Sequence, residues 1–277
     1  MSPRRRPRTP RTLVAVAAAV VALTLAACSA GGSGSGSGTV TAGKLTIATG
    51  QPAYSPWVEG NKPQSGKGFE AAVAYAVAQE MGYAKDDVVW KRSTFDSAIA
   101  PGAKDWDMNI QQFSITAKRK QAVDFSAPYY TTTQAVVTTS GSKAADATSI
   151  SALKGLKVGV ATGTTSYDVA KDALGQPQVF NSNDDAVLAL KSGQIDAVVT
   201  DLPTAFYVAS AELKKGEVVG QFPASSGTGD QFGIVLPKGS ALTPKVSGAI
   251  RALKADGTLQ RITTKWLSTA VDVPVLH

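Results

Sequence analysis

Residues 107–130 read DMNIQQFSITAKRKQAVDFSAPYY, and this stretch decides the fold. It opens on an alternating apolar pair, Met108 and Ile110, which predicts a short strand that ends in a polar turn. Thr116 then offers an N-cap for a basic helical turn, and Pro128 excludes a helix further on. In open α/β sheets, ligands bind where a strand ends beside the start of a helix. The stretch therefore predicts an α/β protein with a binding site at this edge of its sheet.

The polar turn has the chemistry to bind a carboxylate. Backbone N–H groups near Gln112 and Ser114 lie at the strand end, and Arg119 supplies a planar cation one helical turn later. Taken alone, the basic residues 118–120 are more typical of a solvated helix face. The residues on either side of them favour the binding role.

The same residues resemble the S-x-T-x-x-R-x-x-x-V-D-F-S-x-P-Y-Y segment of the polar amino-acid-binding family of ABC-importer proteins (bacterial solute-binding protein family 3). Three further motifs follow in the family's order, so the resemblance covers residues 44–267. It implies a type II periplasmic-binding-protein fold, in which two lobes, each a mostly parallel sheet flanked by helices, are joined by two hinge strands. We expect lobe 1 to hold residues 44–131 and 227–277, and lobe 2 to hold residues 132–226.

The first of these further motifs is Gly68-Phe69-Glu70, which starts a predicted helix that ends near Met81. The family usually has a second acid two residues later, where this chain has Ala72. Glu70 therefore keeps its role at the helix start, while the second acid is missing.

Two further turns complete the site that the resemblance implies. The turn at Thr164 and Thr165 precedes a helix, lacks any phosphate-loop pattern, and in the family lies over the substrate α-carboxylate. Asp201 ends a D-A-V-x-x-D-x-P motif in which the family's second Asp receives the substrate ammonium. The alternative for Asp201 is an N-cap of the helix predicted over residues 202–211.

A loop with two prolines follows the strand predicted over residues 44–49. The resemblance makes its aromatic residues, Tyr54 and Trp57, walls of the ligand cleft; the alternative is that they pack on the lobe itself. Family members that prefer cationic amino acids tend to carry an acid just after this strand. Gly50 stands there, which argues against Lys or Arg as the ligand. The amides of residues 109, 111 and 112 favour a polar or amide-bearing ligand side chain.

The counts of reactive residues exclude several classes of site. Cys28 is the only cysteine and His277 the only histidine, so an intrachain disulfide, Ser-His-Asp catalysis and a multi-His metal site are excluded. We expect no metal and no cofactor. The formal charge is +7, but five arginines precede Cys28, which leaves 23 basic and 21 acidic residues after it. A charge of +2 gives nucleic-acid binding little support.

The N-terminus is typical of an exported lipoprotein. A basic segment, residues 1–12, precedes 15 apolar residues that are too few to span a bilayer comfortably and end at Ala27. The following Cys28 completes a lipobox, so we expect a signal peptide over residues 1–27, lipid on Cys28 and a location on the extracytoplasmic face of the membrane. An ordinary signal peptide with an incidental cysteine is the alternative. Residues 28–43 are a Gly/Ser tether with a reach of roughly 20 Å.

The resemblance implies a monomeric, non-enzymatic protein that captures a polar amino acid or a similar zwitterion and delivers it to an ABC permease with its ATPase. An arogenate-type or cyclohexadienyl dehydratase on the same fold is the alternative. Such an enzyme would need Glu59, Glu70 or Asp201 as its general acid. Incubation with prephenate or arogenate separates the two.

Overall fold

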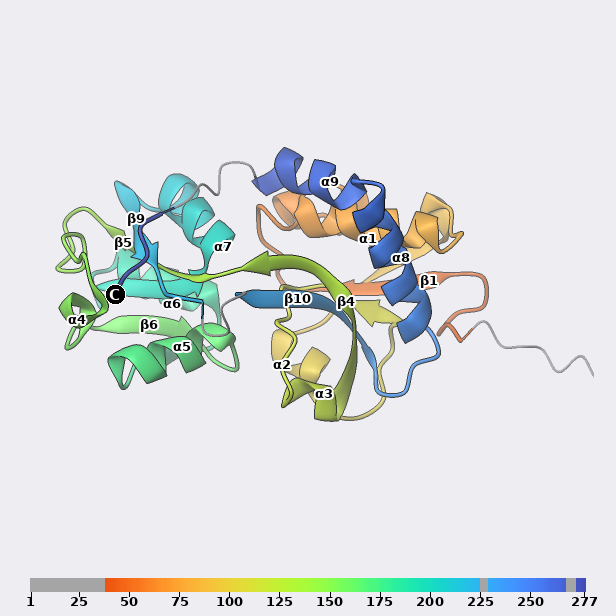
Figure 1. Cartoon of the computed structure of the whole chain (residues 1–277), viewed down its shortest axis with the longest axis horizontal. Coiled ribbons are helices and arrows are strands. Elements are labelled where there is room, and N and C mark those ends of the chain that lie inside the picture. The colour runs from red at the N-terminus through yellow and green to blue at the C-terminus, as the bar shows by residue number, and fades with distance from the viewer. Residues whose placement is uncertain (1–37, 225–228, 268–272) are drawn as a thin grey trace, which may run out of the picture. The chain divides into compact units, whose positions relative to one another are not determined.

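The computed structural model describes residues 38–224, 229–267 and 273–277, and these residues build two five-stranded sheets (Figure 1). In the first sheet, three parallel strands are followed by two that run antiparallel to each other. The order is β2 (Val88–Arg92), β1 (Leu45–Thr49), β3 (Met108–Asn109), β10 (Asp230–Pro237) and β4 (Val123–Thr132). We call this sheet and its helices lobe 1.

Helices cover both faces of the first sheet, so its inner strand β1 is buried along its whole length. One face packs in a large apolar core against three helices: α1 (Phe69–Glu80), α8 (Thr243–Ala255) and α9 (Thr258–Leu267). The other face packs in a smaller core against two short helices: α2 (Phe95–Ile99) and α3 (Arg119–Ala122). A sheet covered in this way exposes only its strand ends for ligand binding.

The second sheet forms lobe 2 and is also covered on both faces. Its order is β7 (Gln178–Phe180), β6 (Val158–Ala161), β8 (Ala197–Asp201), β5 (Gln134–Thr139) and β9 (Gly216–Gln221). Its helices are α4 (Ile150–Leu153), α5 (Thr165–Leu174), α6 (Asn183–Lys191) and α7 (Leu202–Tyr207), the last continued by a π-helical turn over Val208–Glu212. Ser and Thr side chains cap three of these helices.

Two stretches of the chain run from one lobe to the other, and β4 and β10 are their lobe 1 parts. These two strands lie side by side in Figure 1. The β-branched run from Thr131 to Thr139 suggested one strand, but the structure divides it at Thr133 into β4 of lobe 1 and β5 of lobe 2. Pro128 lies inside β4, opposite Gly233, where the pairing register shifts. A proline is tolerated at such an irregularity because no regular ladder hydrogen bond is required there.

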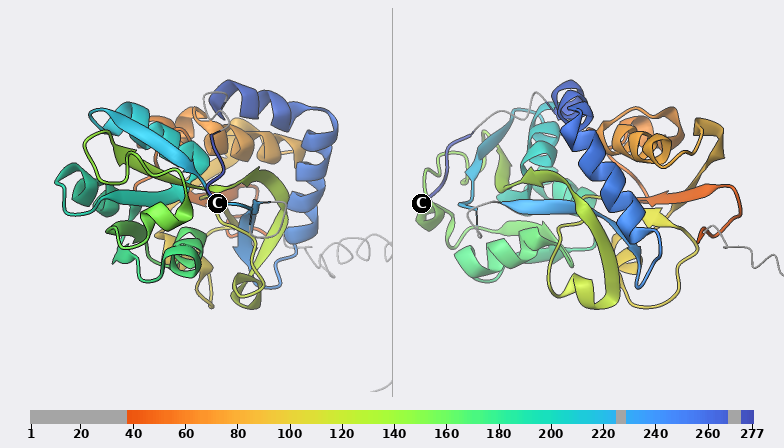
Figure 2. Two further views of the ribbon diagram at one scale, coloured as in Figure 1. Left: turned by 60° about the vertical axis from the view of Figure 1, so that its left-hand side comes forward. Right: turned by 45° about the vertical axis from the view of Figure 1, so that its right-hand side comes forward.

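The C-terminal residues leave lobe 1, although we expected all of residues 227–277 to belong to it. Val275 forms a parallel bridge with Gln221 of β9, and the His277 carbonyl accepts a hydrogen bond from the Ile150 N–H in lobe 2. Both views of Figure 2 show the C-terminus beside this sheet. The side chain of Leu276 is 1% exposed and lies over Gly220, where a side chain would meet it at 2.8 Å. Burial of this leucine explains why the tail adds to lobe 2.

The signal peptide, Cys28 and most of the predicted tether lie outside the described residues. The tether's last residues are described, and the Val40 N–H donates a 2.6 Å hydrogen bond to Asp107 of lobe 1. Residues 38–43, which we assigned to the tether, therefore include a residue that is held to lobe 1. In the described part of the chain, no helix is both long and apolar enough to cross a membrane.

Helix α1 begins where the proline-containing loop comes closest to it. Gly68 has φ +102°, and a Cβ at this position would lie 2.5 Å from the Trp57 carbonyl oxygen. That oxygen accepts hydrogen bonds from the Glu70 and Ala71 N–H groups at the start of the helix. Only glycine permits this approach, which fixes the loop at the carboxyl end of β1.

Candidate functional site

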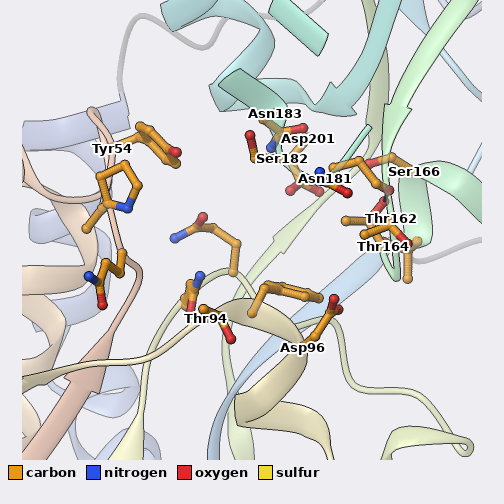
Figure 3. A pocket seen from close by; sticks show the side chains of 18 of the residues that line it. Tyr54, Thr94, Asp96, Thr162, Thr164, Ser166, Asn181, Ser182, Asn183 and Asp201 are labelled. Carbon is orange, nitrogen blue, oxygen red and sulfur yellow. Dashed lines mark hydrogen bonds between the residues drawn. The ribbon is translucent and has the colours of Figure 1, made fainter. Parts of the chain in front are cut away.

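A cavity of about 210 Å³ lies between the two lobes. Its lining comes from the strand ends and helix starts of both sheets (Figure 3). Figure 3 shows Tyr54 on one side, facing Asn181, Asn183 and Asp201 across the cavity. The lining includes Gln51, Tyr54, Phe95, Gln112, Ser114, Arg119, Thr164, Thr165, Asn183 and Asp201.

Arg119 is the buried cation of the cavity, with a side chain only 8% exposed. Thr116 accepts a hydrogen bond from the Arg119 N–H at 3.1 Å, which confirms the predicted cap. One guanidinium nitrogen donates to the Ser114 carbonyl at 2.8 Å and another to the Gly163 carbonyl of lobe 2 at 3.0 Å. The group also lies over the Phe95 ring, 5.2 Å from its centroid. A guanidinium carries five N–H donors, so donors remain for a carboxylate.

The start of helix α5 contributes donors from lobe 2. Thr164 caps the helix by accepting from the Tyr167 N–H at 3.2 Å, while the hydroxyls of Thr165 and Ser114 lie 3.1 Å apart across the lobes. The first N–H groups of a helix have no intrahelical acceptors and favour an anion. Arg119 donates to Gly163 immediately before this turn, so the cation and the helix start meet at one end of the cavity.

Asp201 is the carboxylate that lobe 2 contributes to the cavity, and Asp96 of lobe 1 also lines it. Asp201 occupies the N-cap position of α7, as the alternative expected, although its side chain makes no capping hydrogen bond. Its Oδ1 instead accepts from Gln134 Nε2 at 2.8 Å, and that nitrogen also lies 2.9 Å from Asp230 Oδ2. Burial, with Asp230 nearby, raises the pKa of Asp201 to about 7, although Gln134 and Arg119 oppose the shift. Such a carboxyl gains most from a ligand cation.

Gln112 lines the cavity from the turn after β3, with its backbone in the left-handed region at φ +48°. Its N–H donates to Glu70 Oε1 at 2.7 Å, and its side-chain nitrogen donates to the other Glu70 oxygen. The Tyr129 hydroxyl is the third donor to this carboxylate. For the binding function, Glu70 was expected to start helix α1. The structure shows that it also holds the turn, and burial raises its pKa to about 7.

The two aromatic residues of the proline-containing loop have different positions. Tyr54 lines the cavity and hydrogen-bonds to Asp184 of lobe 2. Trp57 does not line this cavity: it is 1% exposed, packs edge-on against Phe69 and donates a 2.9 Å hydrogen bond from its indole to Thr204 of lobe 2. The alternative of a packed aromatic therefore describes Trp57, while Tyr54 occupies the predicted wall.

Position 50 does not line the cavity, so the residue at this position does not report on the charge of the ligand side chain. A side chain at Gly50 would meet the Pro52 carbonyl oxygen at 2.7 Å and Gln111 Nε2 at 2.9 Å. Gln51 is the residue after β1 that lines the cavity. Gln51 is uncharged. The expectation that the ligand is not Lys or Arg therefore rests on Gln51 rather than on Gly50.

Sequence reasoning missed several lining residues. Asn181 and Asn183 follow strand β7, and the rule that ligands bind at carboxyl ends of parallel strands would have found them. Phe95 is the first residue of helix α2, directly after its N-cap Thr94. This helix is only five residues long, so its sequence gives a weak signal. Gln134 does not line the cavity but contacts the acid pair Asp201 and Asp230, and a glutamine in a β-branched run gives no indication of this contact.

The arrangement suits a zwitterion. Arg119 and the start of α5 match a carboxylate, Asp201 matches an ammonium, and amides and hydroxyls supply most of the remaining polar lining. Within the described ranges, no group of three or more His, Cys, Asp or Glu side chains is arranged to hold a metal ion.

Comparison with known proteins agrees with this geometry. The model of the family described as bacterial extracellular solute-binding proteins, family 3, matches residues 45–269. The ABC transporter arginine-binding protein 1 of Escherichia coli (strain K12) is 32% identical over 212 residues, covering 72% of this chain and 81% of that protein.

Two solved structures are similar over most of the chain. An ancestral arginine-binding protein bound to glutamine is 34% identical, with a TM-score of 0.68, and the match covers 82% of this chain and 98% of that one. An ancestral amino acid-binding protein described as a precursor of cyclohexadienyl dehydratase is 30% identical, with a TM-score of 0.66, covering 81% and 95%. With the two mixed sheets, these neighbours confirm the predicted type II periplasmic-binding-protein fold.

Proposed function

Because the chain belongs to the bacterial extracellular solute-binding proteins of family 3, we propose that it captures an amino acid between its lobes and delivers it to an ABC permease with its ATPase. One observation carries the proposal. A single cavity holds one buried arginine from lobe 1 and one carboxyl group from lobe 2, and each keeps hydrogen-bonding capacity for a ligand. A free amino acid offers the two complementary charges, which are costly to bury unpaired.

Screening the twenty amino acids by thermal shift, followed by calorimetry, tests the proposal. A ligand that binds only the folded chain stabilises it by about 2.7 kcal/mol at a concentration of 100 times its Kd. At least one amino acid should therefore raise the melting temperature by several degrees. If none does so at millimolar concentration, the proposed function is wrong.

For the ligand side chain, we propose a polar group bound by amides and hydroxyls. Gln51 and Asn183 line the cavity from opposite lobes, and the Gln111 amide oxygen is buried there without a hydrogen-bond partner. Such an acceptor favours a ligand that carries N–H donors. L-Glutamine qualifies with an uncharged side chain and is the first probe. L-Arginine also carries N–H donors, but the uncharged Gln51 argues against its cationic side chain, so it is the second probe; the names of similar proteins include both.

We propose no catalytic role for this chain. The relatives that it matches are described as binding proteins. Of the three acids that a dehydratase on this fold would have available here, Asp201 lines the cavity, whereas Glu59 and Glu70 do not. In the binding function, Asp201 already has a use as the partner of the ligand ammonium.

We also propose that lipid on Cys28 holds the protein on the extracytoplasmic face of the membrane, as a monomer. The support is the lipobox in the sequence, with its single cysteine at the end of a run too short to span a bilayer. Replacing Cys28 with Ala should release the protein from the membrane fraction or leave an uncleaved precursor. The measurement is fractionation with immunoblotting, with Ser35→Ala in the tether as the control. Unchanged membrane association of the Cys28 variant would contradict lipid anchoring.

The ligand should bring the lobes closer, because its carboxylate and ammonium contact residues of both. Contacts between the lobes, such as the hydrogen bond from Trp57 to Thr204, must break when the cavity opens. Solution scattering should therefore show a larger radius of gyration for ligand-free protein than for protein saturated with its amino acid. Identical profiles, with binding confirmed by calorimetry, would show that the cavity does not close on its ligand.

A further inference from the structure

A buried carboxylate outside the cavity determines how one wall of it is built. Glu70 is 0% exposed and does not line the cavity, yet two of its three hydrogen-bond donors come from Gln112, which does. The third donor is Tyr129, itself 4% exposed. A carboxylate only accepts hydrogen bonds, so every group around it must present an N–H or O–H.

This requirement fixes the orientation of the Gln112 side chain. An amide has a donating nitrogen and an accepting oxygen at its end, and Glu70 takes the nitrogen. The amide oxygen is then the polar atom of this side chain that is left for the cavity. The same carboxylate binds the Gln112 N–H and so helps to hold the residue at φ +48°, a conformation that residues other than glycine rarely adopt.

We propose that Glu70 is a positioning residue of the ligand site: its buried carboxylate locks the turn at Gln112 and directs the amide oxygen of that residue to an N–H donor of the ligand. This inference rests on the proposed binding of an amino acid. It extends that proposal by assigning a role to a residue that does not contact the ligand. An acceptor at this place matches the ammonium or the side-chain N–H groups of L-glutamine and L-arginine.

A double-mutant cycle tests whether Glu70 acts through Gln112. Glu70→Gln keeps the shape but replaces one accepting oxygen with a donor, and should weaken binding of L-glutamine or L-arginine by roughly 10- to 100-fold. Gln112→Ala should also weaken binding, and the double variant should be at most about twofold worse than the weaker-binding single variant. Glu80→Gln, at an exposed position of the same helix, is the control and should change affinity by less than about twofold. If the two losses multiply in the double variant, or if Glu70→Gln binds like wild type, the inference is wrong.

Hydrogen exchange provides a test that needs no variant to fold. In the wild-type protein, the side-chain amide protons of Gln112 should exchange at least about tenfold more slowly than those of the exposed Gln79 on helix α1, as measured by NMR. Equal exchange rates would overturn the positioning role, whatever the ligand. If slow exchange is found but no amino acid binds, the proposed function fails while the contact between Glu70 and Gln112 stands.

Discussion

Replacing Arg119 with Ala should weaken amino-acid binding by about 2–5 kcal/mol, which is roughly 30- to 5,000-fold in Kd. The variant leaves the ligand carboxylate buried without its cation. It also removes the hydrogen bond to the Ser114 carbonyl within lobe 1 and the one to the Gly163 carbonyl of lobe 2, which joins the lobes at this end of the cavity. Arg119→Lys keeps the charge but loses the planar fork that makes these contacts together, so it too should bind clearly more weakly. Calorimetry with L-glutamine or L-arginine gives the values.

Two neighbouring lysines provide matched controls for Arg119. Lys118 and Lys120 are exposed, whereas Arg119 between them is buried. Lys118→Ala and Lys120→Ala should each change the binding free energy by less than about 0.5 kcal/mol. If all three alanine variants bind almost as well as wild type while remaining folded by circular dichroism, Arg119 is not the carboxylate partner, and the site built around it must be abandoned.

Replacing Asp201 with Asn should weaken binding by a similar amount, about 2–5 kcal/mol, because the ligand ammonium loses its only charged partner in our assignment. Asp172→Asn, at an exposed position of helix α5 that does not line the cavity, is the matched control. Equal affinity of the Asp201 variant and wild type would remove Asp201 from the site.

Binding should also depend on pH through Asp201. Its pKa is about 7 in the ligand-free protein, while a bound ammonium favours the ionised form and lowers the pKa. Affinity should therefore be full above pH 7 and fall as the pH drops below 7, by up to about tenfold per unit. The corresponding α-hydroxy acid has no ammonium, so its binding should lack this contribution. Calorimetry from pH 5 to 8 with both compounds makes the comparison; identical pH dependence for the two would exclude Asp201 as the titrating partner.

The same shift has the opposite sign for the stability of the ligand-free protein. The pKa of Asp201 is raised above its ordinary value of 3.8, so the folded chain keeps a proton that the unfolded chain has already lost. The stability from this group is fully present below about pH 4 and is lost as the pH rises through about 7. Without ligand, acid favours the fold at this position; with ligand, it weakens binding.

The parts of the fold that were predictable are those determined by local chemistry. The helix over Asn183–Lys191 and the cap at Thr116 follow from periodicity and capping, which need only neighbouring residues. The motifs around Arg119 and Asp201 indicated the two charged residues of the cavity, because strand ends and helix starts are where an α/β sheet exposes its polar groups.

What could not be predicted depends on contacts between distant residues. Trp57 and Tyr54 share one loop, and only the packing of Trp57 against Phe69 decides which of them faces the cavity. Glu70 lies 42 residues from the turn that it holds, and its sequence context indicates only a helix start. The burial of Leu276 requires the bare backbone of Gly220, which no local pattern indicates.

The attachment of the C-terminal tail to lobe 2 places the two ends of the described chain on different bodies. The first end is held to lobe 1 by the hydrogen bond from Val40 to Asp107, and the last residue, His277, is bonded to Ile150 of lobe 2. A pair of fluorescent labels at these ends would therefore respond to movement of one lobe against the other without any label in the cavity. The two ends of the described chain are therefore suitable label positions for a single-molecule sensor, because neither end lies in the site that recognises the solute.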